Sequence, residues 1–233
     1  MRFVAISVVL VLAGAVRAGP EDAVVRITSH GGSGVVVATG EGWTVVLSAS
    51  HIFQGSGARR KITIDAPAPR PGGPKSVGVQ LVGLAHQGEG DLAVLQIADG
   101  PLPYVAEVAP EGITPGPCWS IGYDEMRGRA LKRPASIVGQ AGPSTTLTSE
   151  RPWHGRSGGG LIDAGTGYLV GIVSAYEGPS NRAELANGYH GVYASHGAIF
   201  RFLRRTGHIR GPSPQQFSQP VPRQFTTPRP CPT

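Results

Sequence analysis

A serine flanked by glycines, in the segment HGRSGGGL (154–161), is the first residue of this chain whose setting suggests chemistry. The hydroxyl of Ser157 is a poor nucleophile at neutral pH, and it needs a base to take its proton and a third group to orient that base. Glycine makes up 35 of the 233 residues, so a merely flexible turn is the alternative. The choice depends on whether the rest of the chain offers a base and an orienting acid.

A histidine and an aspartate are candidates for these two roles. His51 follows the apolar segment WTVVLS and the small residues Ala49 and Ser50, which let other segments approach closely. Asp91 begins the apolar run DLAVLQI, where a carboxylate without a partner would be costly to bury. Taken singly, His51 also fits the end of a strand and Asp91 the start of one, so neither residue identifies a site alone.

The segments around these residues are typical of antiparallel β-structure. Runs of four to nine residues rich in Val, Ile and Thr alternate with Gly and Pro, which favour turns. One helix is predicted over 196–206, where Ile199, Phe200 and Leu203 share a face and Gly207 suits the C-terminus. The predicted fold class is all-β with a C-terminal helix. Strands are expected at 23–28, 34–39, 43–48, 61–64, 76–84, 91–97, 135–140, 144–149 and 168–175.

In chain order, the segments LSASH, DLAVL and GRSGGGL resemble the signature segments of the chymotrypsin-fold serine proteases. The order His, Asp, Ser distinguishes this fold among triad enzymes. The segments at 169–175 and 191–195 are similar to those that follow the serine in that family. The resemblance covers residues 22–207 and is closest to bacterial Deg-type secreted proteases. It implies two six-stranded antiparallel barrels of the chymotrypsin type and a C-terminal helix.

The resemblance gives each of the three residues a role. Ser157 would attack the scissile carbonyl, His51 would move the proton, and Asp91 would orient His51. The backbone N–H groups of Gly155 and Ser157 would form the oxyanion hole. The implied function is a secreted serine endopeptidase that acts on polypeptides and uses neither a cofactor nor a metal.

Three segments would form the walls of the substrate-binding pocket by the same resemblance. One extends from Arg151 to His154, a second contains Ser174, Ala175 and Tyr176, and the third lies near Gly191. Arg151 stands where trypsin-like enzymes carry an acid, so a preference for Lys or Arg is not expected. Tyr176 favours a small or medium apolar side chain, whereas Arg151 or His154 favours an acidic one, and the sequence leaves this choice open.

Two other functions fit parts of the sequence. A catalytically silent relative that binds peptides would share the fold, but the intact trio argues against it. An α/β-hydrolase esterase also carries G-x-S-x-G and needs an acid and then a histidine after the serine, here Asp163 or Glu177 with a later histidine. The absence of β–α alternation disfavours this second alternative.

The two ends of the chain differ in composition from the middle. Residues 1–18 combine an early arginine, an apolar run and small residues near Ala18, which is typical of a secretory signal peptide, so we expect a secreted or periplasmic protein. Residues 208–233 contain seven prolines and no acid, which predicts a disordered tail of polyproline II character. Docking through this tail and a dispensable extension are both open.

The remaining composition limits the classes of partner. Without Arg2 and Arg17, the 21 basic residues fall to 19 against 15 acidic ones, a net charge of about +4. The basic groups are not interleaved with aromatics, so no nucleic-acid partner is expected. No later segment is long and apolar enough for stable membrane insertion. Cys118 and Cys231 cannot form a disulfide framework, and Cys118 is expected to be buried.

Two residues near the motifs carry further expectations. Ser33, in HGGSGVV, has no candidate base nearby and is interpreted as a turn residue. Arg156 stands directly before Ser157, where animal relatives carry an acid that pairs with a freshly cut N-terminus. Because an arginine would repel an ammonium group, we expect no activating cleavage beyond removal of the signal peptide.

Overall fold

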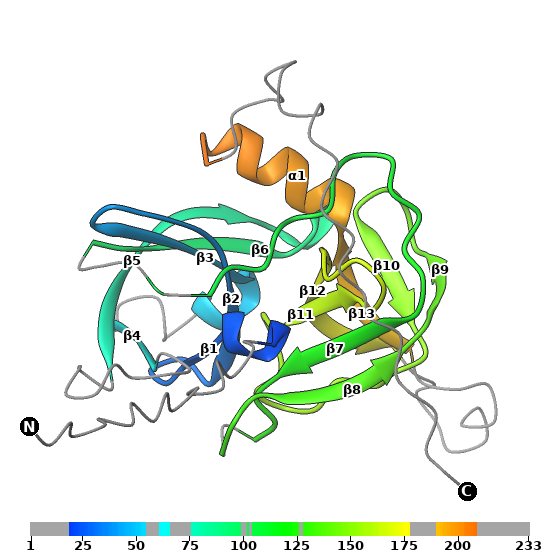
Figure 1. Cartoon of the computed structure of the whole chain (residues 1–233), viewed down its shortest axis with the longest axis horizontal. Coiled ribbons are helices and arrows are strands. Elements are labelled where there is room, and N and C mark those ends of the chain that lie inside the picture. The colour runs from blue at the N-terminus through cyan, green and yellow to red at the C-terminus, as the bar shows by residue number, and fades with distance from the viewer. Residues whose placement is uncertain are drawn as a thin grey trace, which may run out of the picture.

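The computed structural model describes residues 19–54, 61–65, 76–98, 102, 104–125, 128–177 and 190–208. Two β-sheets and one α-helix make up the described chain (Figure 1). The predicted signal peptide and all of the predicted tail except His208 lie outside these residues. No helix in the described part is long and apolar enough to cross a membrane.

Within the described residues, the first sheet is a closed six-stranded barrel with the order β1-β2-β3-β6-β5-β4. All its neighbouring strands are antiparallel. Val, Ile and Leu side chains from alternate strand positions fill its interior, as a half-buried strand pattern predicts. The strands are β1 (Val24–Ile27), β2 (Gly32–Gly40), β3 (Trp43–Ala49), β4 (Ile62–Asp65), β5 (Val77–Ala85) and β6 (Leu92–Ile97).

The second sheet has seven strands among the described residues, in the order β8-β7-β11-β12-β13-β10-β9. Its two outermost strands, β8 and β9, are separated in sequence by Ser136 alone. One bent segment therefore pairs with β7 through its first half and with β10 through its second half, so the sheet curls back on itself. The strands are β7 (Cys118–Gly122), β8 (Leu131–Ala135), β9 (Ile137–Gln140), β10 (Thr145–Thr148), β11 (Gly160–Asp163), β12 (Leu169–Glu177) and β13 (His190–Ser195).

These sheets confirm the chymotrypsin-type fold class, with one difference in the second unit. The sequence predicts a second six-stranded barrel, whereas the structure has a curled sheet of seven strands because the bend at Ser136 divides one strand into two. All nine strands expected from composition are present, with ends shifted by one to a few residues. The composition did not predict β7, β8, β11 and β13.

The helix α1 (His196–Arg205) packs against β6 of the barrel and against β12 and β13 of the second sheet (Figure 1). The Ser195 side chain accepts a hydrogen bond from the Ala198 N–H at 3.2 Å and caps the helix. Ile199 and Leu203 are buried as expected, but Phe202 is buried in place of Phe200, which is only half-buried. The described residues also form three short 3₁₀ helices: η1 (Pro20–Ala23), η2 (Ser50–Phe53) and η4 (Gln87–Glu89).

Candidate active site

Strand pairing brings His51 and Asp91 together. β3 and β6 are antiparallel with Ala49 opposite Leu92, so the end of β3 lies beside the start of β6. His51 follows β3 in η2, and Asp91 directly precedes β6. The backbone continues this pairing, because the Ser50 N–H donates to the Asp91 carbonyl at 3.1 Å.

The Asp91 carboxylate accepts four hydrogen bonds. Its Oδ1 accepts from the His51 backbone N–H at 2.9 Å and from Ser50 Oγ at 2.7 Å. Its Oδ2 accepts from Ser174 Oγ at 2.5 Å and lies 2.6 Å from His51 Nδ1. Because an ionised carboxylate only accepts, Nδ1 carries the proton, which leaves Nε2 of a neutral ring as a base.

Burial and hydrogen bonding act in opposite directions on Asp91. Its residue surface is 2% exposed, which by itself raises the pKa of the carboxyl. Hydrogen bonds from His51, Ser174 and Ser50 outweigh this effect and hold the pKa below its usual value. The backbone of Asp91 has φ of 54°, a conformation that non-glycine residues rarely adopt and that often marks functional sites.

A β-bulge turns Ser174 toward Asp91. β12 and β13 pair regularly up to Val173 opposite Tyr193, and the register then shifts so that Ala175 lies opposite Val192. Ser174 is the extra residue on β12, and a bulge of this kind redirects a side chain. The bulged serine is buried and donates to Asp91 across the boundary between the two sheets.

Ser157 lies in a segment that we call the serine loop, residues 153–159. The Arg156 N–H donates to the Trp153 carbonyl at 3.0 Å and closes a turn in which Gly155 has φ of 88°. Gly158 has φ of 84°, and a Cβ on it would lie 2.1 Å from the Ser33 carbonyl oxygen. Only glycine therefore fits at position 158, which argues against a loose, flexible turn.

Contacts with both sheets hold the serine loop. The Ser157 carbonyl accepts from the Ser33 N–H at 2.7 Å, and the Gly158 N–H donates to the Val173 carbonyl at 2.8 Å. The Ser33 hydroxyl donates to the Gly155 carbonyl at 2.8 Å and accepts from the Tyr123 N–H at 2.9 Å. The interpretation of Ser33 as a turn residue is wrong, because it is a buried residue of β2 that supports the loop. Its glycine neighbours suggested a turn, and no local signal indicated this contact.

His51 and Ser157 line one cavity of about 220 Å³. Of the residues expected to bind substrate, His154, Ser174 and Ala175 also line it, together with Pro152, Trp153 and Val173. Arg151 is exposed and is not among the lining residues. Tyr176 pairs with Gly191 through β12 and β13, and its side chain lies outside the described part of the structure.

Solved structures share this fold at low sequence identity. The active form of the Rv3671c protease from M. tuberculosis has a TM-score of 0.59 at 22% identity, over 82% of this chain and 83% of that chain. The serine endoprotease from Yersinia pestis has a TM-score of 0.60 at 21% identity, over 80% of this chain and 63% of that one. The MamO protease domain from Magnetospirillum magneticum has a TM-score of 0.57 at 20% identity, over 82% and 97% of the two chains.

A comparison with curated proteins found no match. A family profile described as the trypsin-like peptidase domain matches residues 32–172, a span that holds His51, Asp91 and Ser157. Since this match covers more than half of the sequence, the chain belongs to the trypsin-like peptidase family.

Proposed function

We propose that this chain is an exported serine endopeptidase in which His51, Asp91 and Ser157 form the catalytic triad. The observation that carries the proposal is the 2.6 Å contact between His51 Nδ1 and Asp91 Oδ2. The same histidine lines the cavity that Ser157 lines. Such a contact leaves Nε2 free to take a proton from a nucleophile. Membership of a peptidase family supports the reaction class.

In the proposed reaction, His51 takes the proton of Ser157 as the hydroxyl attacks the peptide carbonyl. Asp91 stabilises the resulting imidazolium, and His51 then gives the proton to the leaving amine. Loss of the amine leaves the acyl group as an ester on Ser157. Water then attacks this ester while His51 takes its proton, the bond to the Ser157 oxygen breaks, and His51 returns the proton to Ser157 as the acid product leaves. Ser50 and Ser174 keep Asp91 ionised through their hydrogen bonds.

The backbone N–H groups of Gly155 and Ser157 are the proposed oxyanion donors. Among the described residues, neither group donates a hydrogen bond to a protein acceptor. The positive φ of Gly155 fixes the direction of its N–H within the turn. Two donors that are unoccupied and fixed in this way suit a carbonyl oxygen that becomes negative during attack.

An extended peptide is the proposed substrate. β11 pairs with β12 only as far as Ile172, so the β11-facing edge of β12 beyond Val173 has no strand partner among the described residues. A substrate strand can bind such an edge through its backbone. The cavity between His154 and Ala175 would then take one side chain next to the scissile bond. Residues 1–18 are the proposed export signal.

Hydrolysis by purified protein that begins at Gly19 tests this function. A fluorogenic peptide library gives the cleaved bonds, and Ser157→Ala and His51→Ala are expected to lower kcat by about four orders of magnitude or more. Ser149→Ala, at an exposed serine directly after β10, serves as the control and is expected to match the parent protein. Undiminished hydrolysis by Ser157→Ala would contradict the assignment.

A further inference from the structure

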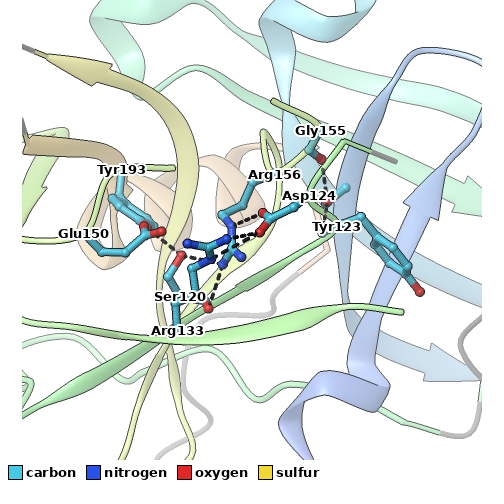
Figure 2. A network of polar contacts seen from close by, with 9 residues as sticks. Ser120, Tyr123, Asp124, Arg133, Glu150, Gly155, Arg156 and Tyr193 are labelled. Carbon is cyan, nitrogen blue, oxygen red and sulfur yellow. Dashed lines mark hydrogen bonds and ion pairs between the residues drawn. The ribbon is translucent and has the colours of Figure 1, made fainter. Parts of the chain in front are cut away.

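The side chain of Arg156, the residue directly before Ser157, is fully buried. Its Nε donates to Asp124 Oδ1 at 2.8 Å, and its Nη1 lies 2.9 Å from the Ser120 carbonyl and 3.2 Å from Ser120 Oγ (Figure 2). Ser120 belongs to β7, and Asp124 follows that strand by two residues. The guanidinium therefore ties the serine loop to β7 and to the segment that follows it.

The partners of Arg156 are themselves held in place. Asp124 Oδ2 accepts from Arg133 of β8 at 2.6 and 3.1 Å, so two guanidinium groups share one carboxylate (Figure 2). The Tyr193 hydroxyl of β13 lies 2.8 Å from Ser120 Oγ and 2.9 Å from Glu150 Oε2. Burial alone raises the pKa of Asp124, but hydrogen bonds from Arg156 and Arg133 outweigh it and hold the pKa below its usual value.

Stability alone does not account for a charge at position 156. A buried ion pair is often no more stabilising than well-packed apolar side chains of the same volume, because both charges lose their hydration. The Nη2 atom of Arg156 adds to this cost, since it is buried and has no hydrogen-bond partner among the described residues. The ion pair also fixes the position of the Arg156 backbone, because a guanidinium with fixed acceptors holds its own backbone in one place.

The backbone of Arg156 lies between the two proposed oxyanion donors. Its N–H closes the turn to Trp153, and its carbonyl accepts from the Gly159 N–H at 2.8 Å. Movement of residue 156 would therefore redirect the N–H groups of both Gly155 and Ser157. The sequence predicts that Arg156 would repel an incoming ammonium group. In the structure, Arg156 forms its ion pair with an internal acid, Asp124, instead.

We propose that the buried Asp124–Arg156 ion pair is a positioning device that holds the serine loop in its reactive conformation without help from a new N-terminus. The proposal rests on the triad function given above. Asp124 and Arg156 act here through the Gly155 and Ser157 N–H groups and do not touch the substrate.

Steady-state kinetics of Asp124→Asn test this role. We expect kcat for one peptide to fall by about 10- to 100-fold, because the variant misdirects the oxyanion donors and their hydrogen bonds are needed mainly in the transition state. KM is expected to change by less than about threefold, since the β12 edge and the cavity are retained. The Ki of a peptidyl boronic acid, which forms a tetrahedral adduct on the serine, should rise in parallel with the loss in kcat.

Asp65→Asn is the matched control, because it makes the same change at an aspartate of β4 that pairs with Arg26 of β1 in the barrel. It is expected to keep the kcat of the parent protein. An unchanged kcat in Asp124→Asn, or a rise in KM alone, would overturn the positioning role. Failure of the triad function would be seen separately, as absence of hydrolysis and of boronate inhibition in the parent protein.

A second variant keeps the test decisive if Asp124→Asn does not fold. Asp124→Leu combined with Arg156→Met replaces the ion pair by apolar side chains and leaves no buried charge alone. We expect this double variant to fold, by circular dichroism, and still to show the reduced kcat. Full kcat in the double variant, or failure of both variants to fold where Asp65→Asn folds, would overturn the proposal in favour of a purely structural pair.

Discussion

At the scale of single residues, glycine is required on each side of Ser157 for a different physical reason. Gly155 has a positive φ that directs a backbone N–H, and Gly158 combines a positive φ with a lack of space for any side chain. The Ser33 carbonyl and the Ser48 hydroxyl would both lie within about 2.2 Å of a Cβ at position 158. The backbone of the first barrel thus approaches the serine loop as closely as packing allows.

Replacement of Gly158 separates crowding from backbone strain. Gly158→Ala and Gly142→Ala both place a side chain at a positive φ, of 84° and 86°, but only position 158 is crowded. We expect Gly142→Ala to cost about 1 kcal/mol of unfolding free energy and Gly158→Ala about 1–3 kcal/mol more, with loss of hydrolysis. Equal effects in urea unfolding would show that crowding at Gly158 plays no part.

The resemblance of LSASH, DLAVL and GRSGGGL to family signatures pointed to His51, Asp91 and Ser157, because the proposed triad depends on few residues in a fixed order. Their supports were not visible in the same way. Ser33 reaches the serine loop from 122 positions away, and the partner of Arg156 depends on how β7 lies beside that loop. Such contacts are set by tertiary packing, and no local pattern encodes them.

At the scale of elements, paired strands and one bulge place the site. The register of β3 and β6 sets His51 beside Asp91, and the bulge in β12 adds Ser174. Composition predicted β3, β6 and β12 because each contains a long, continuous run of apolar residues. It missed β8 (LKRPA) because an outer strand can be polar and contain Pro, and it missed the four-residue β11 behind the glycines.

Helix α1 offers a test at this scale. Phe202 is 3% exposed, whereas Phe200 on the neighbouring face is half-buried. Phe202→Ala should therefore cost about 3–5 kcal/mol of unfolding free energy, and Phe200→Ala clearly less. Thermal unfolding of the two variants measures the difference, and a larger loss for Phe200→Ala would contradict the observed orientation of the helix.

At the scale of the whole molecule, the candidate site lies where the barrel and the second sheet meet. The barrel supplies His51, Asp91 and Ser33, and the second sheet supplies Ser174 and the serine loop. The two carboxylates that hold this junction and its loop, Asp91 and Asp124, both have a pKa below the usual value.

These lowered pKa values predict how stability responds to acid. An aspartate in the unfolded chain titrates near 3.9, above the value in the folded protein, so below that pH the unfolded state takes up protons first. The contribution of both carboxylates is therefore complete above about pH 4 and is lost as the pH falls through the folded values. Calorimetry from pH 7 to 3 should show a falling Tm, with a shallower fall in Asp124→Asn. A Tm independent of pH below 4 would contradict this account.

An internal support for the serine loop also predicts tolerance at the N-terminus. A chain that carries extra residues before Gly19 has no free ammonium group at that position, but Asp124 still holds Arg156. We expect the extended chain and the chain that begins at Gly19 to have the same kcat. Activity that appears only after the extension is cleaved would contradict this expectation.

Identification of the residue modified by a fluorophosphonate tests the central claim most directly. The reagent is expected to add to Ser157, and mass spectrometry of the digested protein should find the adduct on the peptide that contains HGRSGGGL. His51→Ala should lose this adduct while its circular dichroism stays that of the parent protein. Absence of an adduct on the folded parent protein, or an adduct on another serine, would contradict the assignment of Ser157 as the nucleophile.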